Sequence, residues 1–195
     1  MGKPRITLPV KLICGLLGGD PDLLRRARQL LIRRYGPTDH ESEPIPFNLT
    51  DYYRTEMGGN LNRLFLSFER LIQPAALAEI KLETNAIEQE IADTGVDPEI
   101  SRPVNLDPGY IDLGKLVLAT TKDRSHRIFI GSRIYAEVTL HRVGDAWHTW
   151  PWTYRDYATP AYHAFFDAAR TRLHDARRRL ESIDGDSAAP CPSPG

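Results

Sequence analysis

The sequence predicts an α+β protein with a mixed or antiparallel sheet, and three observations support this prediction. Apolar residues recur every three to four positions in three segments, each of which begins with a proline after a polar residue. Between these segments lie short runs rich in apolar, β-branched and aromatic residues, as in strands. The order is strand, helix, two strands, helix, then further strands and a last helix. The simplest topology for this order is a ferredoxin-like βαββαβ core followed by a C-terminal meander and a closing helix.

The expected helices cover residues 21–35, 74–93 and 160–180. Proline is tolerated at a first helical position because an N–H would be unpaired there in any case, and Asp20 and Thr159 can cap the exposed amides. The expected strands cover residues 10–17, 42–47, 61–68, 116–121, 127–130 and 134–141. The run 10–17 is almost continuously apolar, which predicts a strand covered on both faces.

The charge balance and the two cysteines indicate which classes of protein this chain does not belong to and in which compartment we expect it. The 195 residues include 25 Lys and Arg against 26 Asp and Glu, a formal net charge of -1. This balance excludes proteins that hold nucleic acid or anionic membranes by a general excess of basic residues. No apolar run reaches the roughly 20 residues that cross a bilayer. Cys14 lies in an apolar run and Cys191 in a Pro/Ser/Gly tail, so we expect no disulfide and a cytoplasmic protein.

We expect a single α+β domain over residues 1–183 and a disordered tail over residues 184–195, because the tail is too poor in apolar residues to pack.

The glycines before the first helix do not form a phosphate loop of the type G-x-x-x-x-G-K-[ST]. Gly15-x-x-Gly18 does lie between a strand and a helix, where backbone amides can bind a phosphate. Asp20, however, occupies the place that such an anion would take. We therefore interpret this segment as a strand-to-helix turn that Asp20 caps.

One edge of the second helix carries a candidate ligand site. Lys81, Asn85 and Glu88 fall in a narrow arc beside the apolar stripe, where an ammonium, an amide and a carboxylate can bind phosphate, orient a group and accept a proton. The alternative is a solvated helix face with weak contacts between its side chains. The chain has only five lysines against 20 arginines, so lysine is not its usual surface cation.

Residues 105–110, Asn-Leu-Asp-Pro-Gly-Tyr, contain the proline and glycine that a type II turn requires. We therefore expect a rigid loop here. The turn explains the proline and the glycine, but not Asn105 and Asp107, whose short polar side chains can hold Mg²⁺ or a hydroxyl group. Asp107 is thus a candidate catalytic residue and a candidate metal ligand, and Mg²⁺ is the candidate cofactor.

The C-terminal meander offers a second group of candidates. With Gly131-Ser132-Arg133 as a three-residue loop, the expected cross-strand pairs are Ile130–Ile134, Ile128–Ala136, Phe129–Tyr135 and Arg127–Glu137. A two-residue loop would instead place His126 opposite Glu137. This face is either solvated or a binding surface with rings and a charged pair. Glu137 is a candidate base, and His126, Arg127 and Tyr135 are candidate ligand-binding residues.

Two further segments carry suitable side chains. Thr120-Thr121-Lys122 ends a strand with two hydroxyls and an ammonium, which can contact phosphate. Rings are crowded into residues 150–157, where packing is the ordinary explanation, although aromatic loops also stack against bases or sugars.

Several of these segments resemble an uncharacterised prokaryotic family of unknown function, numbered 4416 among such domains. The resemblance rests on residues 9–17, 47–53, 65–72, 80–85, 105–110, 116–122, 126–127, 135–140 and 152–157. It covers roughly residues 9 to 170 and implies no established activity. Relatives are sometimes labelled GTP-binding, but the phosphate loop is missing, and Asp123 directly follows Lys122 where a guanine-reading motif needs a residue between them.

The leading hypothesis is a small enzyme or ligand-binding domain for a phosphorylated substrate such as a nucleotide. Lys81 and Lys122 would contact phosphate, Asn105 and Asp107 would hold a metal or hydroxyl, and Glu137 or Glu88 would be the base. For an enzyme we expect the side chains of Lys81, Asp107 and Glu137 to be buried in one pocket, within about 10 Å of each other, and to have shifted pKa values.

The alternative hypothesis is a non-catalytic module that binds RNA or protein through the exposed sheet face. The first and third helices are rich in arginine, and RNA binding would be favoured if both lay on one side of the sheet.

Overall fold

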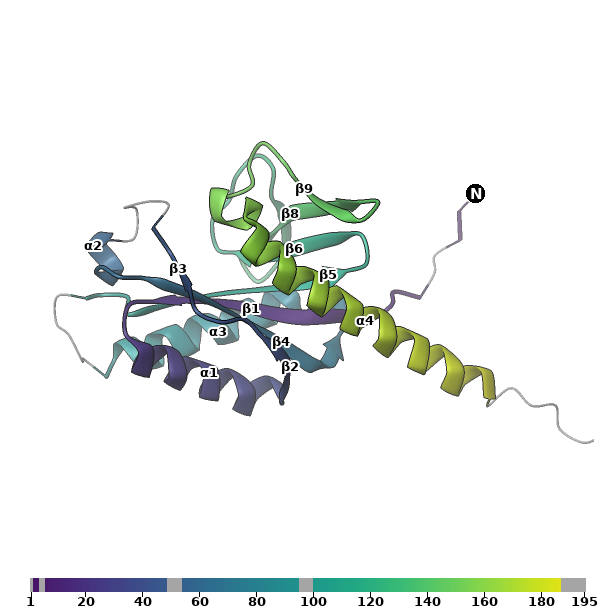
Figure 1. Cartoon of the computed structure of the whole chain (residues 1–195), viewed down its shortest axis with the longest axis horizontal. Coiled ribbons are helices and arrows are strands. Elements are labelled where there is room, and N and C mark those ends of the chain that lie inside the picture. The colour runs from purple at the N-terminus through teal and green to yellow at the C-terminus, as the bar shows by residue number, and fades with distance from the viewer. Residues whose placement is uncertain (1, 4–5, 49–53, 95–99, 187–195) are drawn as a thin grey trace, which may run out of the picture.

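In the computed structural model, which describes residues 2–3, 6–48, 54–94 and 100–186, nine strands form one antiparallel sheet with helices on both faces (Figure 1). The α+β class is confirmed. The elements in chain order are β1 (Val10–Gly18), α1 (Pro21–Tyr35), β2 (Thr38–Glu41), β3 (Ile45–Pro46), α2 (Arg54–Met57), β4 (Asn62–Ile72), the 3-10 turn η1 (Pro74–Ala76), α3 (Leu77–Ala92), β5 (Val104–Asp112), β6 (Lys115–Thr120), β7 (Ile128–Gly131), β8 (Ile134–Val143), β9 (Ala146–Thr149), the 3-10 turn η2 (Arg155–Ala158) and α4 (Pro160–Asp186).

The strand order is β2-β4-β1-β5-β6-β8-β7, with β3 added beside β4 and β9 beside β8. The first four strands in this order belong to the segment β1-α1-β2-β4-α3-β5, so β1 lies between β4 and β5 and is antiparallel to both. This arrangement is compatible with the ferredoxin-like expectation. Strands β6 to β9 extend the sheet with antiparallel pairing, but the order is not that of a simple meander, because β6 pairs with β8 and both β7 and β9 pair with β8.

The two faces of β1 pack against different helices, which explains its continuous apolar sequence. Leu12, Cys14 and Leu16 belong to a core cluster with residues of α1 and α3 on one face. Ile13 belongs to a second cluster on the opposite face, together with Phe165 and other residues of α4 (Figure 1). A strand buried on both faces is mostly apolar, and the one charged residue of β1, Lys11, is buried with its ammonium bonded to Asp39 and to the carbonyl of Phe68.

Helix α1 has the expected bounds, and its start shows why. Asp20 accepts hydrogen bonds from the backbone N–H groups of Asp22 (2.7 Å) and Leu23 (3.4 Å), which confirms the predicted cap. The second expected helix begins as the turn η1 before it becomes α3. Helix α4 ends at Asp186, so residues 184–186 of the predicted tail are helical, and residues 187–195 lie outside the described part of the chain.

The expected strand over residues 42–47 is wrong in its bounds. Strand β2 ends at Glu41, and β3 covers only Ile45–Pro46, both paired with β4. The prolines at positions 44 and 46 interrupt the run because a proline has no N–H to donate to a strand ladder.

The predicted turn over residues 105–110 is also wrong, because these residues form the middle of β5. Gly109 does not supply a positive φ. It is needed because a Cβ there would lie 2.4 Å from the carbonyl oxygen of Val117 and 2.6 Å from Cδ2 of Leu118 on β6. Pro108 faces Cys14 of β1, and β6 pairs with β5 only from Gly109 onward, so no ladder bond to β6 is lost at the proline.

The hairpin of β7 and β8 has most of the predicted register. The pairs Ile128–Ala136 and Phe129–Tyr135 are present, whereas Gly131 rather than Ile130 lies opposite Ile134 because of an irregularity near the turn. Ser132 and Arg133 take positive φ values of 51° and 61° to close it.

Replacing Gly109 by alanine tests the close contact between β5 and β6. The added methyl group would collide with backbone as well as side-chain atoms, so we expect the free energy of unfolding to fall by about 1–3 kcal/mol. Urea denaturation of the Gly109→Ala variant measures this loss. Gly114→Ala is the control because a Cβ there has no atom within 4 Å. Equal stability of the two variants would contradict the prediction.

Candidate functional site

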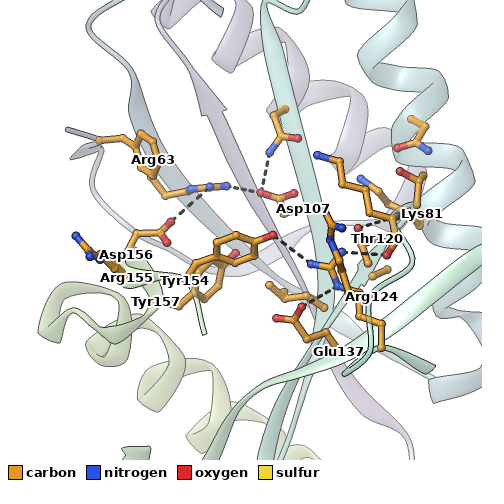
Figure 2. Close-up of a pocket in the computed structure, with 18 of the residues that line it drawn as sticks. Arg63, Lys81, Asp107, Thr120, Arg124, Glu137, Tyr154, Arg155, Asp156 and Tyr157 are labelled. Atoms are coloured by element: carbon orange, nitrogen blue, oxygen red, sulfur yellow. Dashed lines mark hydrogen bonds and ion pairs between the residues drawn. The ribbon is translucent and has the colours of Figure 1, made fainter. Parts of the chain in front are cut away.

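The sheet divides at Gly109, and a cavity opens where it divides. Strand β5 pairs with β6 only over Gly109–Asp112, whereas the preceding residues of β5 continue beside β1 alone. Strand β6 continues beside β8 as far as Thr120. Between the diverging strands lies a cavity of about 740 Å³ (Figure 2). Its volume falls within the range of small-molecule sites, roughly 300–1,000 Å³.

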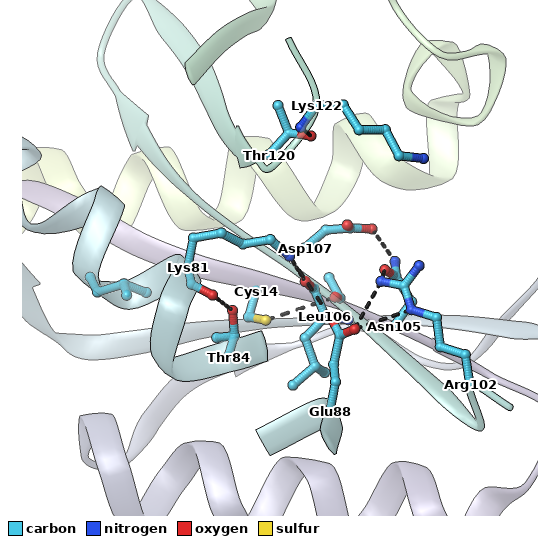
Figure 3. Close-up of polar contacts among 12 residues, drawn as sticks. Cys14, Lys81, Thr84, Glu88, Arg102, Asn105, Leu106, Asp107, Thr120 and Lys122 are labelled. Carbon is cyan, nitrogen blue, oxygen red and sulfur yellow. Dashed lines mark hydrogen bonds and ion pairs between the residues drawn. The ribbon is translucent and has the colours of Figure 1, made fainter. Parts of the chain in front are cut away.

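Two side chains of α3 replace the missing strand as partners for the backbone of β5 (Figure 3). Lys81 Nζ donates a hydrogen bond to the carbonyl of Leu106 (2.7 Å), and the N–H of Leu106 donates to Glu88 Oε1 (2.8 Å). The ammonium and the carboxylate are also 3.8 Å apart. Because unpaired buried backbone groups are costly, this pair allows β5 and β6 to separate.

Glu88 is therefore held by the fold. Its Oε2 accepts hydrogen bonds from Nε (3.1 Å) and Nη2 (2.8 Å) of Arg102, and Arg102 also donates to Asn105 Oδ1. Glu88 does not belong to the cavity lining, whereas Lys81, Arg102 and Asn105 do. Glu88, a candidate base from the sequence, therefore holds Arg102 and the backbone of β5 in place and does not itself face the cavity.

Asp107 and Asp156 share the guanidinium of Arg63 (Figure 2). Nη1 of Arg63 lies 2.7 Å from Asp107 Oδ2, and Nη2 lies 3.7 Å from Asp156 Oδ2. Asn105 Nδ2 also donates to Asp107 Oδ2 (2.7 Å). Both residues line the cavity, and the carboxylate of Asp107 is the more accessible partner, with 27% of its side chain exposed against 2% of that of Arg63.

The surroundings shift the pKa values of Asp107 and Asp156 in opposite directions. Burial alone would raise the pKa of Asp107, but the charges of Arg63, Lys81 and Arg102 and the hydrogen bond from Arg63 hold it below its ordinary value. Burial raises the pKa of Asp156, and Arg63 opposes this rise only in part. Asp107 is therefore an ionised group at neutral pH.

Gly15 of β1 makes room for this arrangement. It lies opposite Phe65 of β4 and opposite Asp107 of β5 in the sheet register. A Cβ at Gly15 would lie 3.1 Å from Nη1 of Arg63 and 3.1 Å from Cε1 of Phe65. This glycine thus serves close packing around Arg63.

Glu137 lies on the other side of the cavity, where β8 continues beside β6. Its Oε2 accepts hydrogen bonds from Arg127 Nε (3.0 Å) and lies 3.1 Å from His126 Nε2, and Thr139 donates to its Oε1 (3.2 Å). Arg127 also donates to the hydroxyl of Tyr154 (3.1 Å). The predicted contact between Arg127 and Glu137 is thus present as a hydrogen-bonded ion pair.

The structure brings together most of the residues that the sequence singled out. Those that line the cavity are Lys81, Asn85, Asn105, Asp107, Lys122, Arg127 and Glu137. Glu88 and His126 do not line the cavity themselves, but each contacts a residue that does, Lys81 and Glu137 respectively. Tyr135 does not line the cavity; its ring packs edge-on against Phe129, with ring centroids 5.6 Å apart. Lys81, Asp107 and Glu137 line one cavity, which is the first part of the expectation for an enzyme.

Sequence reasoning missed other lining residues, among them Arg63, Arg102, Arg124 and Asp156. One signal was available, because Arg63 is a charged residue within the otherwise largely apolar run 61–68. Residues 154–157 belong to the aromatic segment, and the structure places all four in the cavity lining. No pattern within the chain links residue 63 to residue 156, because this contact depends on the sheet order.

Positive charge is concentrated in the cavity. Among the described residues that line it, seven are cationic and three are carboxylates: Arg63, Lys81, Arg102, Lys122, Arg124, Arg127 and Arg155 against Asp107, Glu137 and Asp156. The whole chain has a net charge of -1, so this excess is local. Within the described part of the chain, no cluster of three or more His, Cys, Asp or Glu residues could hold a metal ion.

The fold and the site define an α+β protein with a cation-lined cavity in a divided sheet. The chain belongs to the family described as a domain of unknown function (DUF4416), whose model matches residues 8–173. No curated protein and no solved structure shows significant similarity to it. Among the described residues, no helix has the length and apolar character needed to span a membrane.

Replacing Asp107 by asparagine tests the ion pair with Arg63. The substitution leaves a buried guanidinium without its nearest charge partner, so we expect a loss of about 2–3 kcal/mol in the free energy of unfolding at pH 7. Because the pKa of Asp107 is lowered on folding, its contribution is complete above its ordinary pKa of 3.8 and disappears as the pH falls through the folded value.

Urea denaturation at pH 7 and at steps down to pH 3 measures this dependence. The difference between the wild type and Asp107→Asn should shrink at the acid end. Asp145→Asn serves as the control because its carboxylate is fully exposed. A difference that stays constant over this range would contradict the assignment.

Proposed function

We propose that this protein is a small enzyme or ligand-binding domain for a phosphorylated small molecule. The observation that supports this proposal is the excess of seven cationic residues over three carboxylates around one cavity of about 740 Å³. Such a cavity attracts anions, and guanidinium and ammonium groups are the usual protein ligands of phosphate.

Some of the lining side chains are already engaged with the protein, and others are not. Arg63, Lys81 and Arg127 hold carboxylates or backbone carbonyls. In the described part of the chain, the side chains of Arg124 and Arg155 have no hydrogen bond or ion pair. Two cations without protein partners at the same cavity favour an anionic ligand that supplies the acceptors.

The same cavity offers groups for acid–base chemistry. Asp107 is ionised at neutral pH, and both of its hydrogen bonds from Arg63 and Asn105 fall on Oδ2. Among the described residues, Oδ1 accepts none, so it is the oxygen available to a substrate hydroxyl or water. Glu137 is the second candidate base. The positive charges of Arg63 and Lys81 beside Asp107 repel a metal ion at that carboxylate. We therefore propose that any Mg²⁺ binds to the phosphate groups of the ligand and not to Asp107.

We also propose a cytoplasmic location. Cys14 is a free, buried thiol in the described part of the chain, which suits a reducing compartment.

Thermal-shift measurements with phosphorylated compounds, with and without Mg²⁺, test the proposed function. A ligand that binds the folded state raises the apparent melting temperature by mass action. Arg124→Gln should weaken the binding of any such ligand about tenfold, because a charged hydrogen bond is removed. Arg33→Gln on α1 makes the same charge change on an exposed surface and should have no effect. Absence of a shift with every phosphorylated compound would refute the proposal.

A second candidate function is RNA binding by the meander. Phe129 is 59% exposed and Ile128 is 70% exposed on β7, so apolar groups remain available at this edge. However, the arginine-rich helices α1 and α4 lie on opposite faces of the sheet (Figure 1), and Arg28 and Arg34 of α1 form ion pairs with Glu41 and Glu83. The observations therefore favour the cavity.

RNA binding by this face would be sensitive to salt and would weaken when Phe129 and Tyr135 are both replaced by alanine. Fluorescence anisotropy with a labelled single-stranded RNA at two salt concentrations measures both effects. We expect the double variant to bind about tenfold more weakly if this candidate is correct. Unchanged affinity would remove the face from consideration.

A further inference from the structure

One wall of the cavity has the composition of a phosphate site. The end of β6 and the segment that follows it supply two hydroxyls and three cations to the lining from eight consecutive residues, namely Thr120, Thr121, Lys122, Arg124 and Arg127. The segment is held in shape by its own contacts. The N–H of Arg127 donates to the carbonyl of Arg124 (2.9 Å), and Nη1 of Arg127 donates to the carbonyl of Lys122 (2.9 Å). Preorganised donors of this kind suit a phosphate group.

The opposite wall carries aromatic rings. In Figure 2, Tyr154 and Tyr157 lie on the side of Arg63 and Asp156, whereas Arg124 and Thr120 lie on the side of Lys81. Phe47 also lines the cavity, and its ring centroid lies 5.7 Å from the guanidinium carbon of Arg63. Tyr154 is 52% exposed, although the hydrogen bond from Arg127 fixes its hydroxyl end. An exposed but anchored ring is a ready surface for stacking.

Two polar groups of the cavity lining have no hydrogen-bond partner among the described residues. The hydroxyl of Tyr157 is buried and, among the described residues, has no hydrogen-bond partner. The amide of Asn85 also lines the cavity, and its side chain has no hydrogen bond within the described part of the chain. An amide offers both donors and an acceptor, as the edge of a heterocyclic base requires. A buried hydroxyl without a partner favours a ligand that supplies one, and the half-buried amide of Asn85 is available to the same ligand.

Building on the proposed function, we infer that the ligand is a nucleoside phosphate. Its phosphate binds the segment 120–127, and its base lies against Phe47 and Tyr154. A phosphate group alone would use only the cationic wall and leave the rings and free polar groups unused. A phosphorylated sugar would pair with the polar groups through its hydroxyls but would not stack on the rings as a base does. A cavity of about 740 Å³ has room for a base, a sugar and a phosphate together.

Isothermal titration calorimetry with four nucleoside monophosphates, ribose 5-phosphate and the corresponding nucleosides tests this inference. We expect at least one nucleotide to bind about tenfold more tightly than ribose 5-phosphate, because base stacking adds to phosphate binding. We expect the nucleosides to bind more weakly still, because they lack the phosphate.

Variants separate the two walls. Tyr154→Ala should weaken nucleotide binding about tenfold and leave the binding of ribose 5-phosphate unchanged. Tyr154→Phe loses the same hydrogen bond from Arg127 but keeps the ring, so it should restore nucleotide affinity. Arg124→Gln should weaken the binding of both phosphorylated probes, and Arg33→Gln should weaken neither. Circular dichroism confirms that each variant is folded before titration.

The outcomes distinguish this inference from the proposed function. Equal affinity for nucleotides and ribose 5-phosphate would overturn the base site and leave a phosphorylated ligand in place. Equal affinity for nucleosides and nucleotides would overturn the phosphate site. If no phosphorylated probe binds at all, both the inference and the proposed function fail.

Discussion

The structure depends on how the backbone of β5 is satisfied where β6 leaves it. A strand in the middle of a sheet ordinarily hydrogen-bonds to neighbours on both sides, and losing one neighbour exposes polar backbone groups in the interior. Here Lys81 and Glu88 supply the donor and the acceptor that Leu106 lacks. This substitution of side chains for a strand keeps the sheet open without burying unpaired groups. The cavity exists because the division of the sheet is stabilised in this way.

The same arrangement decides which charges reach the cavity. Residues from β4, β5, β6, β8, α3 and η2 meet at the division, although they are far apart in the sequence. Arg63, Asp107 and Asp156 illustrate this, since three separate segments contribute to a single guanidinium–carboxylate cluster. A chain with nearly balanced total charge thereby acquires a strongly cationic interior surface. Local electrostatics, rather than net charge, set what such a protein can bind.

The sequence was informative about local structure and about several site residues, and the reasons are physical. Helix α1 was predictable because Asp20, Pro21 and the apolar period all indicate the same start. Strand β5 was not predictable, because Pro108 and Gly109 fit two structures. One is a tight turn, and the other is a strand that lacks a neighbour at the proline and lies close to a neighbour at the glycine. Only the contact between Gly109 and Val117 of β6 distinguishes them. Asp107, a candidate catalytic residue and metal ligand from the sequence, lines the cavity, although the local structure predicted for it was wrong.

Arg63 also links two groups that titrate. Because one guanidinium contacts both Asp107 and Asp156, any anion that approaches it changes the proton affinity of the two carboxyls together. Negative charge placed beside this guanidinium would favour the protonated forms of both carboxyls, and their ionised forms would in turn oppose the anion. The affinity of this cluster for an anion and the acidity of Asp107 and Asp156 would therefore depend on each other through Arg63.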